Sequence, residues 1–310
     1  MKIAFFFVCQ SNMKNVNGGR KMRIKKLLAT AALAAMTFSL VACGGSNDKS
    51  ADTSSSDKGT ITITGSTSVE PIVNAMKTEY EALHPDVKIQ YTGNGSSAGI
   101  QDTIKGVNNI GASSRELTDE EKAENLKETV FAYDGIAVAV NPANDVKNIT
   151  LEQLQKIYSG EITNWKELGG KDAEIYVVSR EESSGTRSAF EELIKLEETD
   201  GLTSSAAVSE GNGPVQLAVA KNENAIGYVS FAYIDDTVKQ LTVEGVEGTV
   251  ENVKNSTYPL SRPFLFVVKD GADNKTADEF LKFAVSEDGQ KCVTDNNGIT
   301  VAEEEAAQSK

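Results

Sequence analysis

Four short segments of the sequence combine hydroxyl side chains, glycines and arginines in a way that could bind an anion. They are residues 65–68 (GSTS), 93–97 (GNGSS), 113–115 (SSR) and 180–187 (REESSGTR). Serine and threonine at a helix start can cap its free amides, or donate together with those amides to a bound anion. Glycine permits close backbone approach, and arginine adds charge-assisted hydrogen bonds of about 1.5–3 kcal/mol each. Helix capping alone explains any single segment, so the anion-site interpretation depends on several of them meeting.

The pattern around these segments predicts strands that alternate with helices. Expected strands are residues 61–64, 87–92, 109–112, 134–141, 175–178, 225–233 and 258–268. Expected helices are residues 69–83, 98–105, 278–285 and the segment that carries Phe190, Leu193 and Ile194. Alternation of this kind predicts an α/β fold with a largely parallel sheet. Ligands of such sheets bind beyond the carboxyl ends of the strands, which is where the four segments lie.

The N-terminus has the features of a secretory signal. Residues 20–26 are rich in lysine and arginine, residues 27–38 are apolar, and Leu40-Val41-Ala42-Cys43 follows. The apolar stretch is too short for a membrane span and suits a signal peptide. The ending resembles the lipobox of bacterial lipoproteins, which implies acylation of Cys43; the alternative is an ordinary signal with a chance cysteine. We interpret residues 1–43 as the signal, with those before Met22 as a surplus from an early start codon.

The composition limits what the rest of the chain can do. Residues 44–59 are mostly Gly, Ser and Asp and predict a flexible tether. The chain has 31 basic and 45 acidic residues; the first 43 residues hold seven basic and no acidic ones, which leaves 24 against 45, a formal charge of −21. A chain with this much negative charge is not expected to bind nucleic acid, because binding to the phosphate backbone needs clustered lysine and arginine. An anion site must therefore depend on local donors.

Cysteine and histidine are too scarce for several kinds of chemistry. The cysteines are Cys9, Cys43 and Cys292, so the mature chain would keep one free thiol and form no internal disulfide. With His84 as the single histidine, we expect no transition-metal site and no cofactor. A serine phosphatase or esterase would be the alternative of another class, but the loop serines have no suitable histidine or Ser-x-x-Lys base. The sequence therefore predicts a binding protein, not an enzyme.

Six motifs resemble, in order and spacing, the phosphate-binding proteins of bacterial phosphate importers. They are GSTSVEPI, GNGSSAGI, IGASSREL, DGIAVAVNP, IYSGEITNW and SSGTRSAFE. The resemblance implies a two-lobed periplasmic-binding-protein-like α/β fold, each lobe a mixed sheet flanked by helices, with phosphate in the cleft. Lobe 1 would comprise residues 60–140 and 261–310, and lobe 2 residues 141–260.

The resemblance also implies which residues bind phosphate. Carried onto this sequence they are Ser66, Thr67, Ser68, Ser97, Ser114, Arg115, Arg180, Ser183, Ser184, Gly185 and Thr186. Arg187 is a weaker candidate, because it can pair with Glu191 one helical turn later.

One departure from the family concerns the proton of phosphate. Family members commonly have an aspartate in the segment that here reads Ser113-Ser114-Arg115, where it accepts that proton. We expect Asp134 to replace it, with Glu116 and Glu181 as alternatives. A site built around such a hydrogen bond can reject an analogue that lacks it by about 10⁴–10⁵-fold. Without an acceptor, a binding protein for sulfate, molybdate or another oxyanion is the alternative.

The expected mechanism is capture by closure of the two lobes on phosphate. The partners that the resemblance implies are the permease subunits of an ABC importer and their separate ATPase. The protein would be a monomer held by its lipid at the extracytoplasmic face of the cell membrane. His84 at a helix end is expected at the surface, Trp165 as packing, and Glu303 to Glu305 as a solvated tail.

Overall fold

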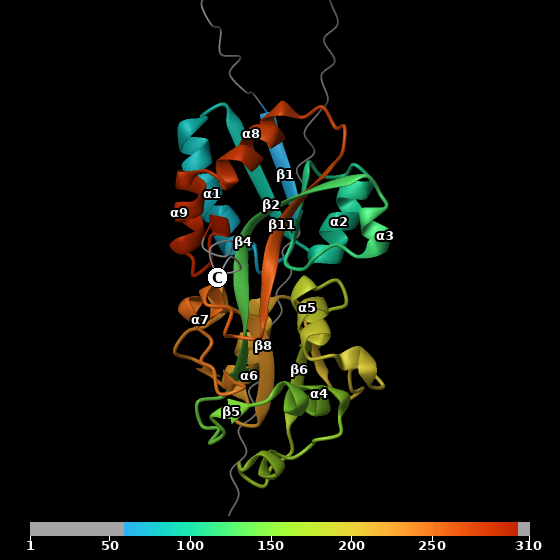
Figure 1. Cartoon of the computed structure of the whole chain (residues 1–310), viewed down its shortest axis with the longest axis vertical. Helices are drawn as coiled ribbons and strands as arrows, with labels where there is room; N and C mark the ends of the chain where they lie inside the picture. Colours follow the sequence, from blue (N-terminus) through green and yellow to red (C-terminus); the bar gives the residue numbers. More distant parts are fainter. Residues whose placement is uncertain (1–58, 303–310) are drawn as a thin grey trace, which may run out of the picture. The chain divides into compact units, whose positions relative to one another are not determined.

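The computed structural model describes residues 59–302 (Figure 1). The expected signal with Cys43, the tether up to residue 58 and the acidic tail at Glu303 to Glu305 lie outside the described residues. None of the helices in residues 59–302 is long and apolar enough to cross a membrane.

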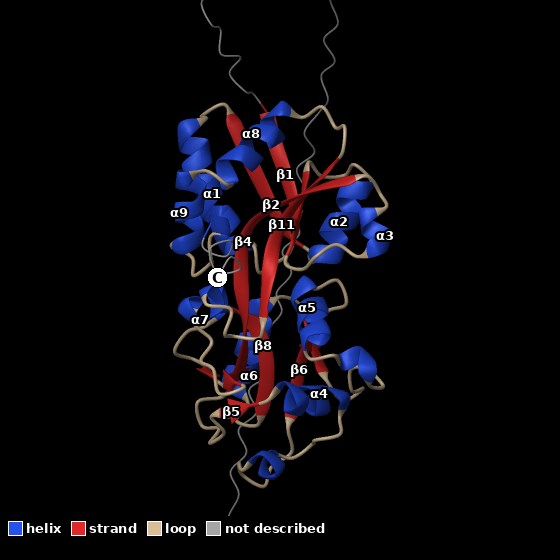
Figure 2. Ribbon diagram, viewed as in Figure 1, coloured by secondary structure: helices blue, strands red, loops and turns tan. Residues whose placement is uncertain are grey.

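Strands and helices alternate along most of the described chain (Figure 2). The strands are β1 (Gly59–Gly65), β2 (Val87–Gly93), β3 (Ile110–Ser113), β4 (Leu126–Val140), β5 (Asn148–Ile149), β6 (Tyr176–Arg180), β7 (Ala207–Ser209), β8 (Ala225–Ser230), β9 (Lys239–Gln240), β10 (Thr242–Val243) and β11 (Ser261–Lys269). The α-helices are α1 (Glu70–Leu83), α2 (Ser96–Ile104), α3 (Asp119–Lys122), α4 (Leu151–Ser159), α5 (Gly185–Leu193), α6 (Asn212–Lys221), α7 (Val250–Lys254), α8 (Lys275–Ala284) and α9 (Glu287–Thr294). Short 3₁₀ helices are η1 (Trp165–Leu168), η2 (Leu196–Glu198) and η3 (Phe231–Tyr233).

Within residues 59–302, nine strands join in one sheet in the order β2-β1-β3-β11-β4-β8-β6-β7, with β9 added on β4. The pairs β1–β2, β1–β3, β6–β8 and β6–β7 are parallel. The long strands β4 and β11 run antiparallel to each other and link the two parallel halves (Figure 1). The sheet is therefore mixed, as the family resemblance implied, and less parallel than the alternation alone predicted.

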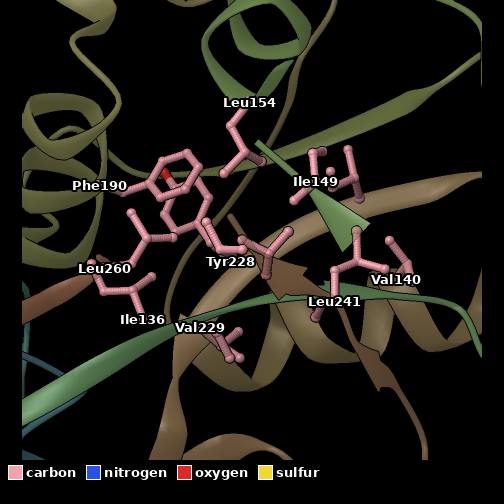
Figure 3. Packing of buried hydrophobic residues seen from close by; sticks show 14 of the residues in the cluster. Ile136, Val140, Ile149, Leu154, Phe190, Tyr228, Val229, Leu241 and Leu260 are labelled. Carbon is pink, nitrogen blue, oxygen red and sulfur yellow. The ribbon is translucent and has the colours of Figure 1, made fainter. Parts of the chain in front are cut away.

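The buried apolar side chains form two large clusters, and β4 contributes residues to both. One cluster contains Phe131 and Ala132 of β4 with residues of β1, β2, β3, β11, α1, α8 and α9. The other begins at Ile136 of the same strand and includes Phe190, Tyr228 and Leu260 (Figure 3). Each parallel half of the sheet thus has its own hydrophobic core, as expected for a fold of two lobes.

Side-chain caps start several helices, among them α5, which was expected, and α4, which the sequence pattern did not predict. Ser184 accepts from the amide of Arg187 (3.2 Å) at the start of α5. Thr150 and Gln153 form a capping box on α4, in which each side chain accepts from the other residue's amide. Such caps satisfy amides that have no partner inside the helix, at about 1 kcal/mol each.

Some expected boundaries are wrong. The strand expected over residues 225–233 ends at Ser230, because the Ser230 hydroxyl accepts from the amide of Ala232 (3.3 Å) and starts η3. The helix expected over residues 278–285 begins at Lys275, where Asn274 caps it, and α9 follows it. The strand expected over residues 134–141 is the second half of β4, which begins at Leu126 and ends at Val140.

Candidate functional site

Hydroxyl groups from the predicted segments meet in a buried cluster. The Ser66 hydroxyl donates to the Ser114 hydroxyl (2.8 Å), and Ser68 Oγ lies 2.8 Å from Thr186 Oγ1. Ser96 Oγ accepts from the backbone amide of Ser114 (3.1 Å). These residues follow β1, β2, β3 and β6 or begin the next helix, so the carboxyl ends of strands in both halves of the sheet do converge. We call Ser66, Ser68, Ser96, Ser114 and Thr186 the hydroxyl cluster.

Arg180, the last residue of β6, adds a buried positive charge beside the hydroxyl cluster. Its side chain is 1% exposed and pairs with Glu181 through Nε (2.8 Å) and Nη2 (2.7 Å). Nη2 also donates to Thr67 Oγ1 (3.2 Å). Nη1 is buried without a hydrogen-bond partner among the described residues. A buried donor of this kind is costly unless a ligand accepts from it.

Glu181 keeps the Arg180 guanidinium in place. Its Oε2 accepts from Arg180 Nε and from the amide of Gly211 (3.2 Å). Burial tends to raise the pKa of Glu181, but the hydrogen bonds and charge of Arg180 outweigh it, so the pKa lies below its usual value. Glu181 is therefore ionised at neutral pH and is engaged by Arg180.

Asp134 forms a second buried ion pair, with Arg262 opposite it in the β4–β11 register. Asp134 Oδ2 accepts from Arg262 Nη2 (2.9 Å) and Nε (3.3 Å), and Oδ1 accepts from the Ser230 hydroxyl (2.9 Å). Burial raises the pKa of Asp134 and the charge of Arg262 opposes the rise. Burial likewise lowers the pKa of the Arg262 guanidinium against the pull of Asp134.

Asn212, at the start of α6, links the loop after β1 to the end of β8. Its Nδ2 donates to Thr67 Oγ1 (3.1 Å) and Ser68 Oγ (3.0 Å). Its Oδ1 accepts from the backbone amide of Ser230 (3.1 Å), which fixes the orientation of the side-chain amide.

Two tyrosines bond backbone carbonyls of the loop after β1. The Tyr91 hydroxyl donates to the carbonyl of Ser66, and the Tyr233 hydroxyl donates to the carbonyl of Thr67 (2.9 Å). Burial, reinforced by the negative charge of Glu70, raises the pKa of Tyr91 well above its usual value and that of Tyr233 to about 12. Both hydroxyls therefore stay protonated and act as donors at physiological pH.

Gly185 allows α5 to approach α2 closely. A Cβ at this position would lie 2.1 Å from Ser96 Oγ and 2.8 Å from Ser114 Oγ. Gly95 has a φ of 94°, and a Cβ there would lie 2.4 Å from Ser183 Oγ. Two of the loops therefore touch at positions where a larger residue would separate them.

A hollow opens beside Arg180 and Thr67. It has a volume of 460 Å³ and is lined by Thr67, Gly93, Asn94, Glu181, Ser183, Glu210 and Gly211. The lining comes from both halves of the sheet, and Thr67 and Glu181 are the residues that bond Arg180.

Three predicted residues lie at the edge of the hydroxyl cluster. Arg115 is bound bidentately by Glu121 (2.7 and 2.8 Å) and donates to Ser97 Oγ (3.0 Å). Ser183 donates to the carbonyl of Asn94 (3.2 Å). Arg115, Ser97 and Ser183 therefore bond to groups outside the cluster. Ser184 caps α5 next to it, and the residues in or against the cluster are Ser66, Thr67, Ser68, Ser114, Arg180, Gly185 and Thr186.

The weaker candidate Arg187 pairs with Glu191 (2.7 Å), as its spacing predicted, and also donates to the carbonyl of Arg180 (3.1 Å). Glu116, an alternative proton acceptor, is exposed, and its carbonyl accepts from Arg115 (2.7 Å).

Four residues of the site were missed by the sequence reasoning, namely Arg262, Asn212, Ser96 and Ser230. Arg262 had a signal, because a charged residue stands directly before the apolar run of β11. Ser96 stands beside the predicted Ser97 in the same segment. Asn212 had a signal too, since Gly211-Asn212-Gly213 resembles the predicted Gly93-Asn94-Gly95, whereas Ser230 ends an apolar strand and carries no such signal.

The remaining single residues have structural surroundings. The His84 ring stacks on Tyr80 with centroids 4.2 Å apart, and it is partly exposed. Trp165 is buried and donates to the carbonyl of Asn224 (2.9 Å), which agrees with a packing role. No group of three or more His, Cys, Asp or Glu residues within 59–302 is placed to hold a metal ion.

A two-lobed α/β fold with a donor-rich site between the strand ends defines the class of periplasmic-binding-protein-like solute-binding proteins. A family model described as "PBP superfamily domain" matches residues 50–288. The phosphate-binding protein PstS of Bacillus subtilis is 35% identical over 290 residues, which cover 89% of this chain and 94% of that protein. The chain belongs to the PstS family of phosphate-binding proteins.

Solved structures agree with this assignment. A phosphate ABC transporter substrate-binding protein of Clostridium perfringens, solved with bound phosphate, is 48% identical, with a TM-score of 0.76 over 78% of this chain and 100% of that one. An ABC-type phosphate transport receptor of Vibrio cholerae is 40% identical, with a TM-score of 0.67 over 77% of this chain and 99% of that one. These relatives are binding proteins, not enzymes.

Proposed function

We propose that this chain captures inorganic phosphate outside the cytoplasm and delivers it to the permease of an ABC importer. The observation that carries the proposal is Arg180, whose buried Nη1 has no protein acceptor and whose Nη2 bonds Thr67 beside the hydroxyl cluster. A small oxyanion supplies several acceptor oxygens to such a set of donors. The relatives named for phosphate support phosphate as that anion.

The proposed binding residues form two sets, one at the hydroxyl cluster and one around it. Ser66, Thr67, Ser68, Ser114, Arg180, Ser184, Gly185 and Thr186 form the inner set. Ser97, Arg115 and Ser183 form an outer set that supports the loops through the contacts described above. Asp134 belongs to the proposed site through its ion pair with Arg262.

We propose that phosphate is captured by closure of two lobes, residues 60–140 with 261–310 and residues 141–260. The two hydrophobic clusters support two lobes, but they divide within β4 between Ala132 and Ile136, a few residues before the proposed boundary at residue 140. Direct bonds between the lobes, such as Ser68 with Thr186 and Thr67 with Arg180, join the two halves of the site. An anion that bonds both halves favours the closed form.

Calorimetry on residues 44–310 with phosphate, and then with sulfate, tests the function. We expect tight phosphate binding, and the ratio of the phosphate and sulfate affinities measures whether the site has an acceptor for the proton that phosphate carries and sulfate lacks. Absence of phosphate binding would overturn the proposal, and tighter binding of sulfate would favour the alternative of another oxyanion.

We further propose that the protein is a monomer anchored by a lipid on Cys43 at the extracytoplasmic face of the cell membrane. The Leu-Val-Ala-Cys ending and the relatives' role in import support this location. Metabolic labelling with palmitate should mark the wild-type chain and leave a Cys43→Ser variant unmarked; labelling of both variants would contradict the assignment. Light scattering of the untethered domain measures its mass.

A further inference from the structure

Arg262 also contacts the hydroxyl cluster. It is 3% exposed, and its guanidinium bonds Asp134, Ser68 Oγ (Nη2, 3.1 Å) and Ser114 Oγ (Nη1, 3.4 Å). A guanidinium has five N–H donors and no acceptor. Every hydroxyl that Arg262 contacts must therefore use a lone pair to accept.

The Ser68 hydroxyl is consequently restricted to one role. Its oxygen accepts from Arg262 Nη2 and from Asn212 Nδ2 (3.0 Å), and the orientation of that amide is set by the Ser230 amide on Oδ1. A serine oxygen has two lone pairs and one proton. With both lone pairs used, the Ser68 proton can only be donated, here to Thr186 Oγ1 (2.8 Å).

The Ser114 hydroxyl is restricted less strongly, because its contact with Arg262 Nη1 is long. It accepts from the Ser66 hydroxyl (2.8 Å) and from Arg262 Nη1 (3.4 Å). The nearest further oxygen is Ser96 Oγ at 3.4 Å, a weak contact. The proton of Ser114 is thus available to a stronger acceptor, such as an oxyanion.

Protein donors occupy three of the roughly four acceptor positions of the Asp134 carboxylate in this arrangement. One carboxylate oxygen accepts two N–H groups of Arg262 and the other accepts the Ser230 hydroxyl. The carboxylate thereby compensates the buried charge of Arg262, which would otherwise be costly to bury.

We propose that Arg262 is a positioning residue that makes the Ser68 hydroxyl an obligate donor and favours the Ser114 hydroxyl as a donor to the anion, and that Asp134 holds Arg262 instead of accepting the phosphate proton. The inference rests on the proposed function, since it concerns how the same site binds phosphate. It replaces the sequence-based expectation that Asp134 substitutes for the family's missing aspartate.

A double-mutant cycle of Arg262→Gln and Ser68→Ala, measured by phosphate calorimetry, tests the coupling. The Gln variant is made with Asp134→Asn, so that no buried carboxylate is left unpaired. We expect this pair of substitutions to weaken phosphate binding by about 10- to 100-fold. In the Ser68→Ala background, the fold loss of phosphate affinity caused by the same pair of substitutions should be at least three times smaller, because part of its effect acts through Ser68. Independent, multiplicative effects would overturn the proposal.

Asp134→Asn alone separates the two roles of the carboxylate, since the asparagine Oδ1 can still accept from Arg262. As a positioning residue, Asp134 should affect phosphate and sulfate equally, so the ratio of the two dissociation constants stays within threefold of wild type. If Asp134 accepts the phosphate proton, the ratio falls by tenfold or more, which would overturn the inference.

Two controls make failures distinguishable. Lys239→Gln removes a partly buried cation that bonds the carbonyls of Asn144 and Val146, and it should leave both affinities unchanged. If the wild-type protein itself binds no phosphate, the proposed function fails. If the wild type binds phosphate and the cycle shows no coupling, the inference alone fails.

Discussion

The guanidinium of Arg180 shows what a single residue contributes to this site. Two of its nitrogens bond Glu181, one of them also bonds Thr67, and the third is buried without a protein acceptor. A planar fork with five donors can satisfy Glu181 and a ligand at once, whereas the three-proton ammonium of lysine cannot cover the same directions. The chemistry of the site therefore demands arginine at this position, not merely a positive charge.

We accordingly expect Arg180→Lys to weaken phosphate binding by about 100-fold, near 2.7 kcal/mol, because the bidentate bond to Glu181 and the bond to the anion cannot both be kept. Calorimetry on the purified domain measures the change. Lys239→Gln serves again as the control, and equal affinities of Arg180→Lys and wild type would remove Arg180 from the site.

At the scale of secondary structure, the start of α5 governs how closely the two parts of the site meet. Ser184 caps this helix, and Gly185 lies against Ser96 of α2 and Ser114. The helix begins with free amides and a small residue, which suits both close packing and anion binding.

Gly185→Ala should therefore lower phosphate affinity by about tenfold, because the added methyl separates α5 from α2 in the closed form. Calorimetry gives the affinity, and thermal unfolding without phosphate should change little. The matched control is Gly213→Ala in α6, where a Cβ would meet no atom within 4 Å. If both variants bind phosphate like wild type, close approach at Gly185 is irrelevant to closure.

The short helix α3 positions Glu121 against Arg115. Burial tends to raise the pKa of Glu121, but the hydrogen bonds and charge of Arg115 and the amide of Thr118 hold it below its usual value. A carboxyl with a lowered folded pKa stabilises the fold above its unfolded pKa, and this contribution is lost as pH falls through the folded pKa.

We expect the free energy of unfolding to fall as pH drops from about 5 to 3, and to fall less steeply in Glu121→Gln. Urea unfolding at several pH values measures both slopes. Parallel curves for the two proteins would show that the Arg115–Glu121 pair does not contribute to the acid sensitivity.

At the scale of the whole molecule, the mixed sheet joins two hydrophobic cores through β4 and β11. Because these two strands carry Asp134 and Arg262, the connection between the cores is also part of the proposed site. Binding at that position couples the ligand to the relative placement of the cores.

Phosphate should therefore stabilise the entire fold against heat. At a concentration 100-fold above the dissociation constant, the gain is about 2.7 kcal/mol, which raises the unfolding temperature by about 5–10 °C for a domain of this size. Differential scanning calorimetry with and without phosphate measures the shift. An unchanged unfolding temperature at saturating phosphate would contradict binding to the folded state.

The sequence by itself determined the local parts of the site. The segments of Ser, Thr and Gly after strands, and the SSGTR segment before α5, were recognisable because caps and close-approach glycines depend on neighbouring residues. The alternation of strands and helices was sufficient for the α/β class. The family resemblance added the two lobes and the mixed sheet.

Only the tertiary structure decided which charges face one another. Arg262 lies 128 residues from Asp134, and their pairing depends on the register of β11 against β4, which no local pattern encodes. The same is true of Asn212, whose bonds to Thr67 and Ser68 span more than 140 residues. Strand register and packing therefore determine which distant residues contact the hydroxyl cluster, because folding buries these distant segments together.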